Sequence, residues 1–382
     1  MPATDLQGSS PSTHAHSSPF SSFGRTLLSL RRDAPAAAAA AMPPPPAVDP
    51  ELEEFHAHVA AHLADLRSSA GAGGEEDEFM SIPWIRRLLE AFLLCQEEFR
   101  VEVAEARRRR GGVTSPAAEK LVVEFGERAV KALDVCNAAR DGVDQARRWE
   151  RLAGIAASAL LPAPAGAEEE GRQRQQIHEG QLRRARKALS DLSVLLIDDA
   201  AAAASVSHTW SAALQLQAIG AALAMPRANE AAAMGCLLHL VAWALVAAVP
   251  CPDRAAALQA HHHLPPPPPR AAFPWAPPLL ALQERLAEEG KRKDRRNSCG
   301  LVREIHALEK CAQRLAEAID AAPVPLTGER EAEVREAAAE LAAACTAMKD
   351  GLDPLERQVR EVFHRIVRSR MEGLDSPMLN AD

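Results

Sequence analysis

The chain has 382 residues, 47% of them hydrophobic, so it is long enough to bury a sizeable core. Much of that hydrophobicity is alanine, with 4% aromatic residues and no tyrosine, which predicts thin cores between closely spaced elements. The formal net charge of -8 argues against a nucleic-acid-binding protein, whose footprint is a surplus of Lys and Arg. Seven scattered cysteines without a CxxC pair indicate reduced thiols in a cytosolic protein rather than a disulfide framework or zinc site.

The N-terminal region combines Ser, Pro, His and Ala and has few large apolar side chains, so we predict that residues 1–50 are disordered. One amphipathic island, FGRTLLSLRR at residues 23–32, mixes apolar and basic residues. It is a candidate partner surface, because a tail that keeps such a patch often folds on binding, and packing against the main body is the alternative. The candidate contact residues of the island are Arg25, Leu27, Leu28, Leu30, Arg31 and Arg32.

Helical periodicity dominates residues 51–371, which we expect to form a single domain with a flexible tail at 372–382. Ser115 and Pro116 form an N-cap and N1 pair that opens a long helix. Its apolar positions then alternate steps of three and four, which predicts coiled-coil-like packing of nearly parallel helices. Gly351 and Pro354 predict a break between the last two helices. The predicted fold is an all-α, elongated antiparallel bundle of about eight to ten helices without strands.

The most apolar segment of the chain is residues 231–249. It is just long enough to cross a hydrocarbon core of roughly 30 Å at about 1.5 Å per residue. Its many Ala and Gly residues add little transfer free energy, however, and His239 would lie near the bilayer centre. We therefore favour a buried helix of a soluble bundle over a membrane span. Whether the segment is a core helix or a membrane span, its large apolar residues are Met234, Leu237, Leu238, Leu240, Val241, Trp243, Leu245, Val246 and Val249.

A predicted Pro/His-rich loop at residues 250–278 precedes the strongest basic cluster of the chain, KRKDRR at residues 291–296. Such clusters bind anionic lipid surfaces at roughly 1 kcal/mol per cation, and they also occur as nuclear import signals or as solvated loops. Ser298 follows in a context that basophilic kinases favour, so it is a candidate phosphosite whose added negative charge would weaken lipid attraction. The five cations are Lys291, Arg292, Lys293, Arg295 and Arg296.

No motif in the sequence supports catalysis, a cofactor or a metal. His58 and His62 share a helix face at a spacing that a metal could use, but no third ligand accompanies them. Adjacent acidic residues such as Asp198 and Asp199 point apart on a helix. We therefore expect a protein that is not an enzyme and has no cofactor, metal ligand or catalytic residue.

Taken in order, several segments resemble the plant BYPASS-related and ROH-type proteins, a family of unknown biochemical activity. The match is spread over most of the chain and is therefore specific. Its segments are FGRTLLSLRR (23–32), WIRRLLEAFLLCQEEFR (84–100), ERAVKALDVCNAARDGV (127–143), SAALQLQAIG (211–220), WALVAAVPCPDR (243–254), KRKDRRNSCGL (291–301) and FHRIVRSRMEGLD (363–375).

The resemblance implies a helical, non-enzymatic interaction protein. ROH-type members are linked to the exocyst, which tethers secretory vesicles to the plasma membrane, and so to cell-wall deposition. The opening of the chain favours this branch, so we expect a cytosolic protein that is peripheral at the plasma membrane and binds an exocyst subunit. The alternative is a single-span or peripheral membrane protein of BYPASS type that restrains a mobile root-to-shoot signal. Gly235, His239 and Ala242 replace the large residues of the family pattern, which weakens the membrane-span reading.

Overall fold

Residues 49–382 form one compact unit, and the computed structural model describes residues 50–68, 78–109, 116–162, 176–204, 229–250, 273–292, 300–321 and 326–374 of it. Over these ranges the chain forms eight helices and no strand, which confirms the predicted all-α bundle. The helices are α1 (Pro50–Ser68), α2 (Ile82–Arg109), α3 (Pro116–Leu160), α4 (Glu179–Ala204), α6 (Asn229–Ala248), α8 (Ala276–Lys291), α9 (Arg303–Asp320) and α10 (Gly328–Leu374).

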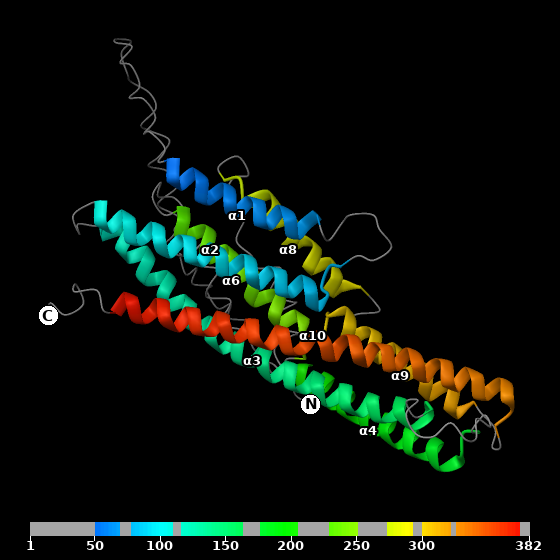
Figure 1. Cartoon of the computed structure of the whole chain (residues 1–382). Helices are drawn as coiled ribbons and strands as arrows, with labels where there is room; N and C mark the ends of the chain where they lie inside the picture. The colour runs from blue at the N-terminus through cyan, green and yellow to red at the C-terminus, as the bar shows by residue number, and fades with distance from the viewer. Residues whose placement is uncertain are drawn as a thin grey trace, which may run out of the picture. The chain divides into compact units, whose positions relative to one another are not determined.

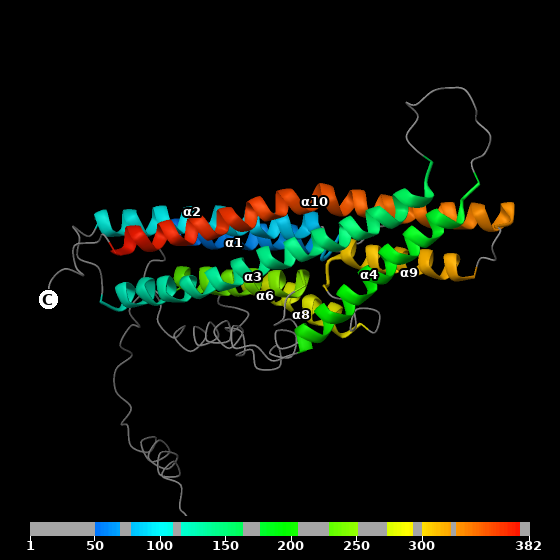
Figure 2. The ribbon, with the colours of Figure 1, turned by 90° about the horizontal axis from the view of Figure 1, so that it is seen from below.

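The two longest helices, α3 and α10, pack against each other over most of their lengths and run in opposite directions (Figures 1 and 2). At one point along this contact, the Cys345 thiol lies 3.8 Å from the carbonyl oxygen of Glu150. On its other side α10 runs parallel to α2, where the Arg365 guanidinium pairs with Glu97 at 2.7 Å. The C-terminal half of α10 is therefore held between α2 and α3.

The N-terminal half of α10 is covered by α9, and α3 is covered by α4. Arg314 of α9 pairs with Glu340 of α10 at 2.6 Å, and Arg186 of α4 pairs with Asp320 at the end of α9 at 3.0 Å. Figure 2 shows α4 running back beside α3 at an angle to it.

Helix α9 buries one apolar stripe, which consists of Ile305, Leu308, Ala312, Leu315 and Ile319. Helix α3 buries Ala132, Cys136, Ala139, Val143 and Ala146, and these small side chains let α10 approach closely, because they keep the helix axes near each other. Four tryptophans supply the bulk that alanine lacks, and all are buried. They are Trp84, Trp149, Trp243 and Trp275.

Two predicted boundaries were wrong. Helix α10 continues through Pro354, although the missing N–H removes one bond to the preceding turn. Buried Leu352 and Leu355 on either side of the proline anchor both halves to the same core, which outweighs that loss. Helix α8 begins at Ala276, inside the predicted loop 250–278. Pro277 and Pro278 lie in its first turn, where N–H groups have no helical partner and proline is tolerated.

Candidate interaction surfaces

The apolar helix α6 lies inside the bundle, in contact with α1, α2, α3 and α8. Every large apolar side chain of residues 234–249 is at most 3% exposed. Within the described ranges, no helix is both long and apolar enough to cross a bilayer. The favoured reading of this segment as a buried helix therefore agrees with the structure, and the membrane-span reading does not.

The C-terminal end of α6 is closed by backbone atoms from elsewhere in the chain. The carbonyl oxygens of Ala247 and Ala248 accept hydrogen bonds from the backbone N–H groups of Leu301 and Val302, at 2.9 and 3.2 Å. These bonds satisfy acceptors that a helix end leaves without internal partners. They also join the end of α6 to Leu301 and Val302, which are distant from it in sequence.

This junction depends on two glycines. A Cβ atom at Gly300 would lie 2.4 Å from the carbonyl oxygen of Ala248, and one at Gly142 would lie 2.5 Å from that of Pro250. Real Cβ atoms do not approach backbone oxygens so closely. The absence of a side chain at Gly300 therefore permits the capping contact. At Gly142 it lets α3 pass directly against the end of α6.

His239 is a buried polar residue of this helix. It is 9% exposed, and its Nδ1 has no hydrogen-bond partner among the described residues. Burial in these apolar surroundings lowers the pKa of His239 to about 4, so its ring is neutral at cellular pH. Gly235 and Ala242, the other two departures from the family pattern, are buried as well.

The basic cluster is described only at its start. Lys291 is the last residue of α8 and Arg292 follows it, and both are exposed. The Arg292 guanidinium lies 3.3 Å from Glu289, one turn back in the helix. Lys293, Arg295, Arg296 and the candidate phosphosite Ser298 lie outside the described residues. The island at residues 23–32, with all of its candidate contacts, lies outside them too.

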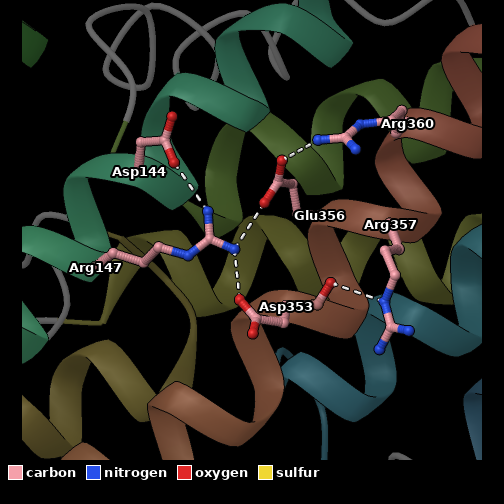
Figure 3. Close-up of polar contacts among 6 residues, drawn as sticks. All are labelled: Asp144, Arg147, Asp353, Glu356, Arg357 and Arg360. Atoms are coloured by element: carbon pink, nitrogen blue, oxygen red, sulfur yellow. Dashed lines mark hydrogen bonds and ion pairs between the residues drawn. The ribbon is translucent and has the colours of Figure 1, made fainter.

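A group of charged residues joins α3 to α10 near Pro354 (Figure 3). The Arg147 guanidinium bonds to Asp144 of its own helix at 2.9 Å, and to Asp353 and Glu356 of α10 at 2.6 and 2.7 Å. Partial burial disfavours this charge, but the three bonds raise the pKa of Arg147 above its ordinary value. On its other side Glu356 pairs with Arg360. Arg147 thus fixes α10 on both sides of its proline.

One turn further along α10, a hollow of about 230 Å³ opens between α3 and α10. Its floor is apolar and consists of Cys136, Val359 and Phe363, and we call it the α3–α10 groove. Burial raises the pKa of the Cys136 thiol to about 12, so the thiol is protonated at cellular pH and packs as an apolar group. The polar residues of the rim are Asn137, Arg140, Glu356, Arg360 and His364.

The candidate metal pair and the cysteines show no sign of a metal or disulfide site in the described ranges. His58 of the candidate pair lies 3.3 Å from Glu98, linking α1 to α2. Across the described part of the chain, no three His, Cys, Asp or Glu residues are grouped so that they could hold a metal ion. The five cysteines in that part are unpaired thiols, and burial raises the pKa of Cys95 and Cys345 to about 12.

The α3–α10 groove was not predicted from the sequence. Its residues lie in or near two segments that carried the resemblance, 127–143 and 363–375, which the antiparallel pairing of α3 and α10 brings side by side. Each segment alone has the pattern of an ordinary amphipathic helix. The groove depends on which residues of α3 lie beside which residues of α10. That alignment cannot be read from a single sequence.

Comparison with known proteins gives the relatives of this chain. The model of the ROH1-like protein family matches residues 15–205 and 200–377. Protein ROH1D of Arabidopsis thaliana is 38% identical over 421 residues, covering 98% of each chain. Protein ROH1A of the same plant is 32% identical over 388 residues, covering 85% of this chain and 89% of its own length. No solved structure gives a significant match. The chain therefore belongs to the ROH1-like family of plant proteins.

Proposed function

We propose that this protein is a non-enzymatic interaction protein that binds an exocyst subunit at the plasma membrane and supports targeted secretion and cell-wall deposition. The observation that carries the proposal is membership of the ROH1-like family over nearly the whole chain. The link to the exocyst comes from the resemblance to ROH-type proteins.

The exposed start of the basic cluster supports peripheral contact with anionic lipid. Lys291 and Arg292 leave α8 into solvent, and three more cations follow within four residues. If two of the five reach the surface, they contribute about 2 kcal/mol, which is roughly 30-fold in membrane partitioning. The attraction weakens as salt rises, because exposed charges are screened.

Vesicle flotation tests the membrane contact. The purified full-length chain is mixed with phosphatidylcholine vesicles that contain or lack phosphatidylserine, at low and high salt. We expect binding that requires phosphatidylserine and low salt, and that is lost when Lys291, Arg292, Lys293, Arg295 and Arg296 are all replaced by Gln. A matched control replaces five exposed cations elsewhere by Gln, namely Arg148, Arg151, Arg183, Arg184 and Lys187. If both variants lose binding equally, net charge rather than the cluster is responsible.

Proximity labelling tests the protein partner separately. The full-length chain fused to a biotin ligase is expressed in plant cells beside a freely diffusing ligase. We expect exocyst subunits to be enriched over the diffusing control. Equal labelling in the two samples would contradict the exocyst proposal, even if the vesicle experiment succeeds.

A further inference from the structure

We propose that the α3–α10 groove is a docking site for a partner protein, and that it takes an acidic peptide in which a large apolar side chain is flanked by carboxylates. This inference goes beyond the exocyst and lipid proposals and depends on neither. It rests on the size of the groove, on its apolar floor, and on two arginines that line it from different helices.

The size of the groove limits what it can hold. Its volume of about 230 Å³ lies below the roughly 300–1,000 Å³ of sites that enclose a whole small molecule. Cys136 and Val359 of the floor are buried, and Phe363 is half-buried beside them. A hollow of this size with an apolar floor suits one large side chain, as in the anchor pockets at the centre of protein–protein interfaces.

The rim selects for negative charge. Arg140 of α3 is exposed and has no ion-pair or hydrogen-bond partner among the described residues, so its guanidinium is available to a ligand. Arg360 of α10 donates to Glu356, yet its side chain is still 56% exposed. Glu356 is the carboxylate of the lining, and it is already bonded to both Arg147 and Arg360 (Figure 3). A carboxylate of a partner therefore meets two guanidinium groups and no unpaired carboxylate of the lining.

The carboxylates just outside the groove do not cancel this preference. Asp144 is bonded to Arg147, and Glu361 is bonded to Arg365. Asp141 follows the lining arginine of α3 in sequence, but successive residues of a helix point about 100° apart, and Asp141 is not part of the lining. Charge-assisted bonds from the two arginines to a peptide carboxylate are about twice as strong as bonds between neutral groups.

Peptide display against the full-length chain tests the proposal. A phage library of random twelve-residue peptides is selected in parallel on the purified chain, on Arg140→Glu and on Arg148→Glu. Arg148 is also an exposed arginine of α3, but it does not line the groove, so its variant is the matched control. We expect peptides that carry a large apolar residue with a carboxylate within about four positions on either side. They should be enriched on the starting chain and on the control, but not on Arg140→Glu.

Fluorescence anisotropy then measures the best peptide. Arg140→Glu should raise its Kd about tenfold or more, because a charge-assisted bond is replaced by repulsion. Exchanging the matching carboxylate of the peptide for lysine should restore binding to Arg140→Glu and weaken binding to the starting chain. Replacing the apolar residue of the peptide by serine should abolish binding to both. A p-benzoylphenylalanine at that apolar position should crosslink to residues 132–140 and 356–364.

Every other outcome overturns the proposal. A selection without an acidic class of peptides, or acidic peptides that bind Arg140→Glu as tightly as the starting chain, would remove the electrostatic basis. Crosslinks outside the two stretches would place the peptide elsewhere. Vesicle binding that Arg140→Glu abolishes would make lipid the occupant, and a dimer that it dissociates would make a second copy the occupant. The peptide variants are also measured on the starting chain, so the test stands even if Arg140→Glu is destabilised.

Discussion

Replacement of Gly142 by alanine tests whether α6 ends directly against α3. Glycine-to-alanine changes in a helix interior ordinarily stabilise by about 1 kcal/mol. At this position the added methyl would lie 2.5 Å from the carbonyl oxygen of Pro250 and 2.7 Å from a methyl group of Val249. Overpacking costs about 1–3 kcal/mol, and the upper half of that range applies because the nearest atom belongs to backbone. We expect a net loss of about 1–2 kcal/mol in the free energy of unfolding.

Gly154 is a matched control in the same helix. A Cβ atom there would meet only a carboxylate oxygen of Glu150, at 3.9 Å, so Gly154→Ala should stabilise by about 1 kcal/mol. Urea unfolding followed by far-UV circular dichroism measures both variants, with unchanged m-values as a check on a common transition. The two changes should have opposite signs. Equal stabilisation by both would refute the placement of α6 against α3.

Three further predictions concern the charged and buried groups. Arg147→Met should lower the free energy of unfolding by about 1–2 kcal/mol, because three carboxylates lose their shared partner. The control Arg148→Met should change it by less than about 0.5 kcal/mol. Equal effects of the two variants in thermal melts would show that the Arg147 contacts contribute little. The pKa of His239 is about 4 in the folded chain and about 6.5 when unfolded, so the unfolded state binds the extra proton as pH falls. Stability should decline from pH 6.5 to pH 4 by up to about 3 kcal/mol. His239→Leu should flatten that decline, and identical pH profiles would contradict the burial of the ring. Burial raises the pKa of the Cys136 and Cys345 thiols to about 12, so both should react slowly with Ellman's reagent at pH 8 and rapidly in guanidinium. Rapid labelling of these two cysteines in the folded chain, located by mass spectrometry, would mean that the thiols are exposed.

Much of the helical core could be predicted because its information is local. The stripe of α9, from Ile305 to Ile319, repeats at helical spacing, and each of its members is buried. Pro116 begins α3 as its N1 position predicts, because its missing N–H would have no helical partner there. These signals require only the neighbouring residues, so a single sequence is sufficient.

The wrong boundaries depend on contacts with distant residues. A proline usually interrupts a helix. Helix α10 nevertheless continues through Pro354, because Arg147 bonds to residues on both sides of this proline and because buried leucines flank it. The close fit of Gly142 against the end of α6 is equally invisible in the sequence. The α3–α10 groove likewise exists only because Cys136 and Phe363 are brought into register, more than two hundred residues apart.

Fractionation of the full-length protein from plant membranes tests the central claim most directly, which is that residues 234–249 form a core helix and that membrane contact is peripheral. Membranes are washed with low salt, with high salt and with alkaline carbonate, and the chain is followed by immunoblotting beside a known integral membrane protein. We expect release by high salt and complete release by carbonate. Retention in the carbonate pellet with the integral control would contradict it.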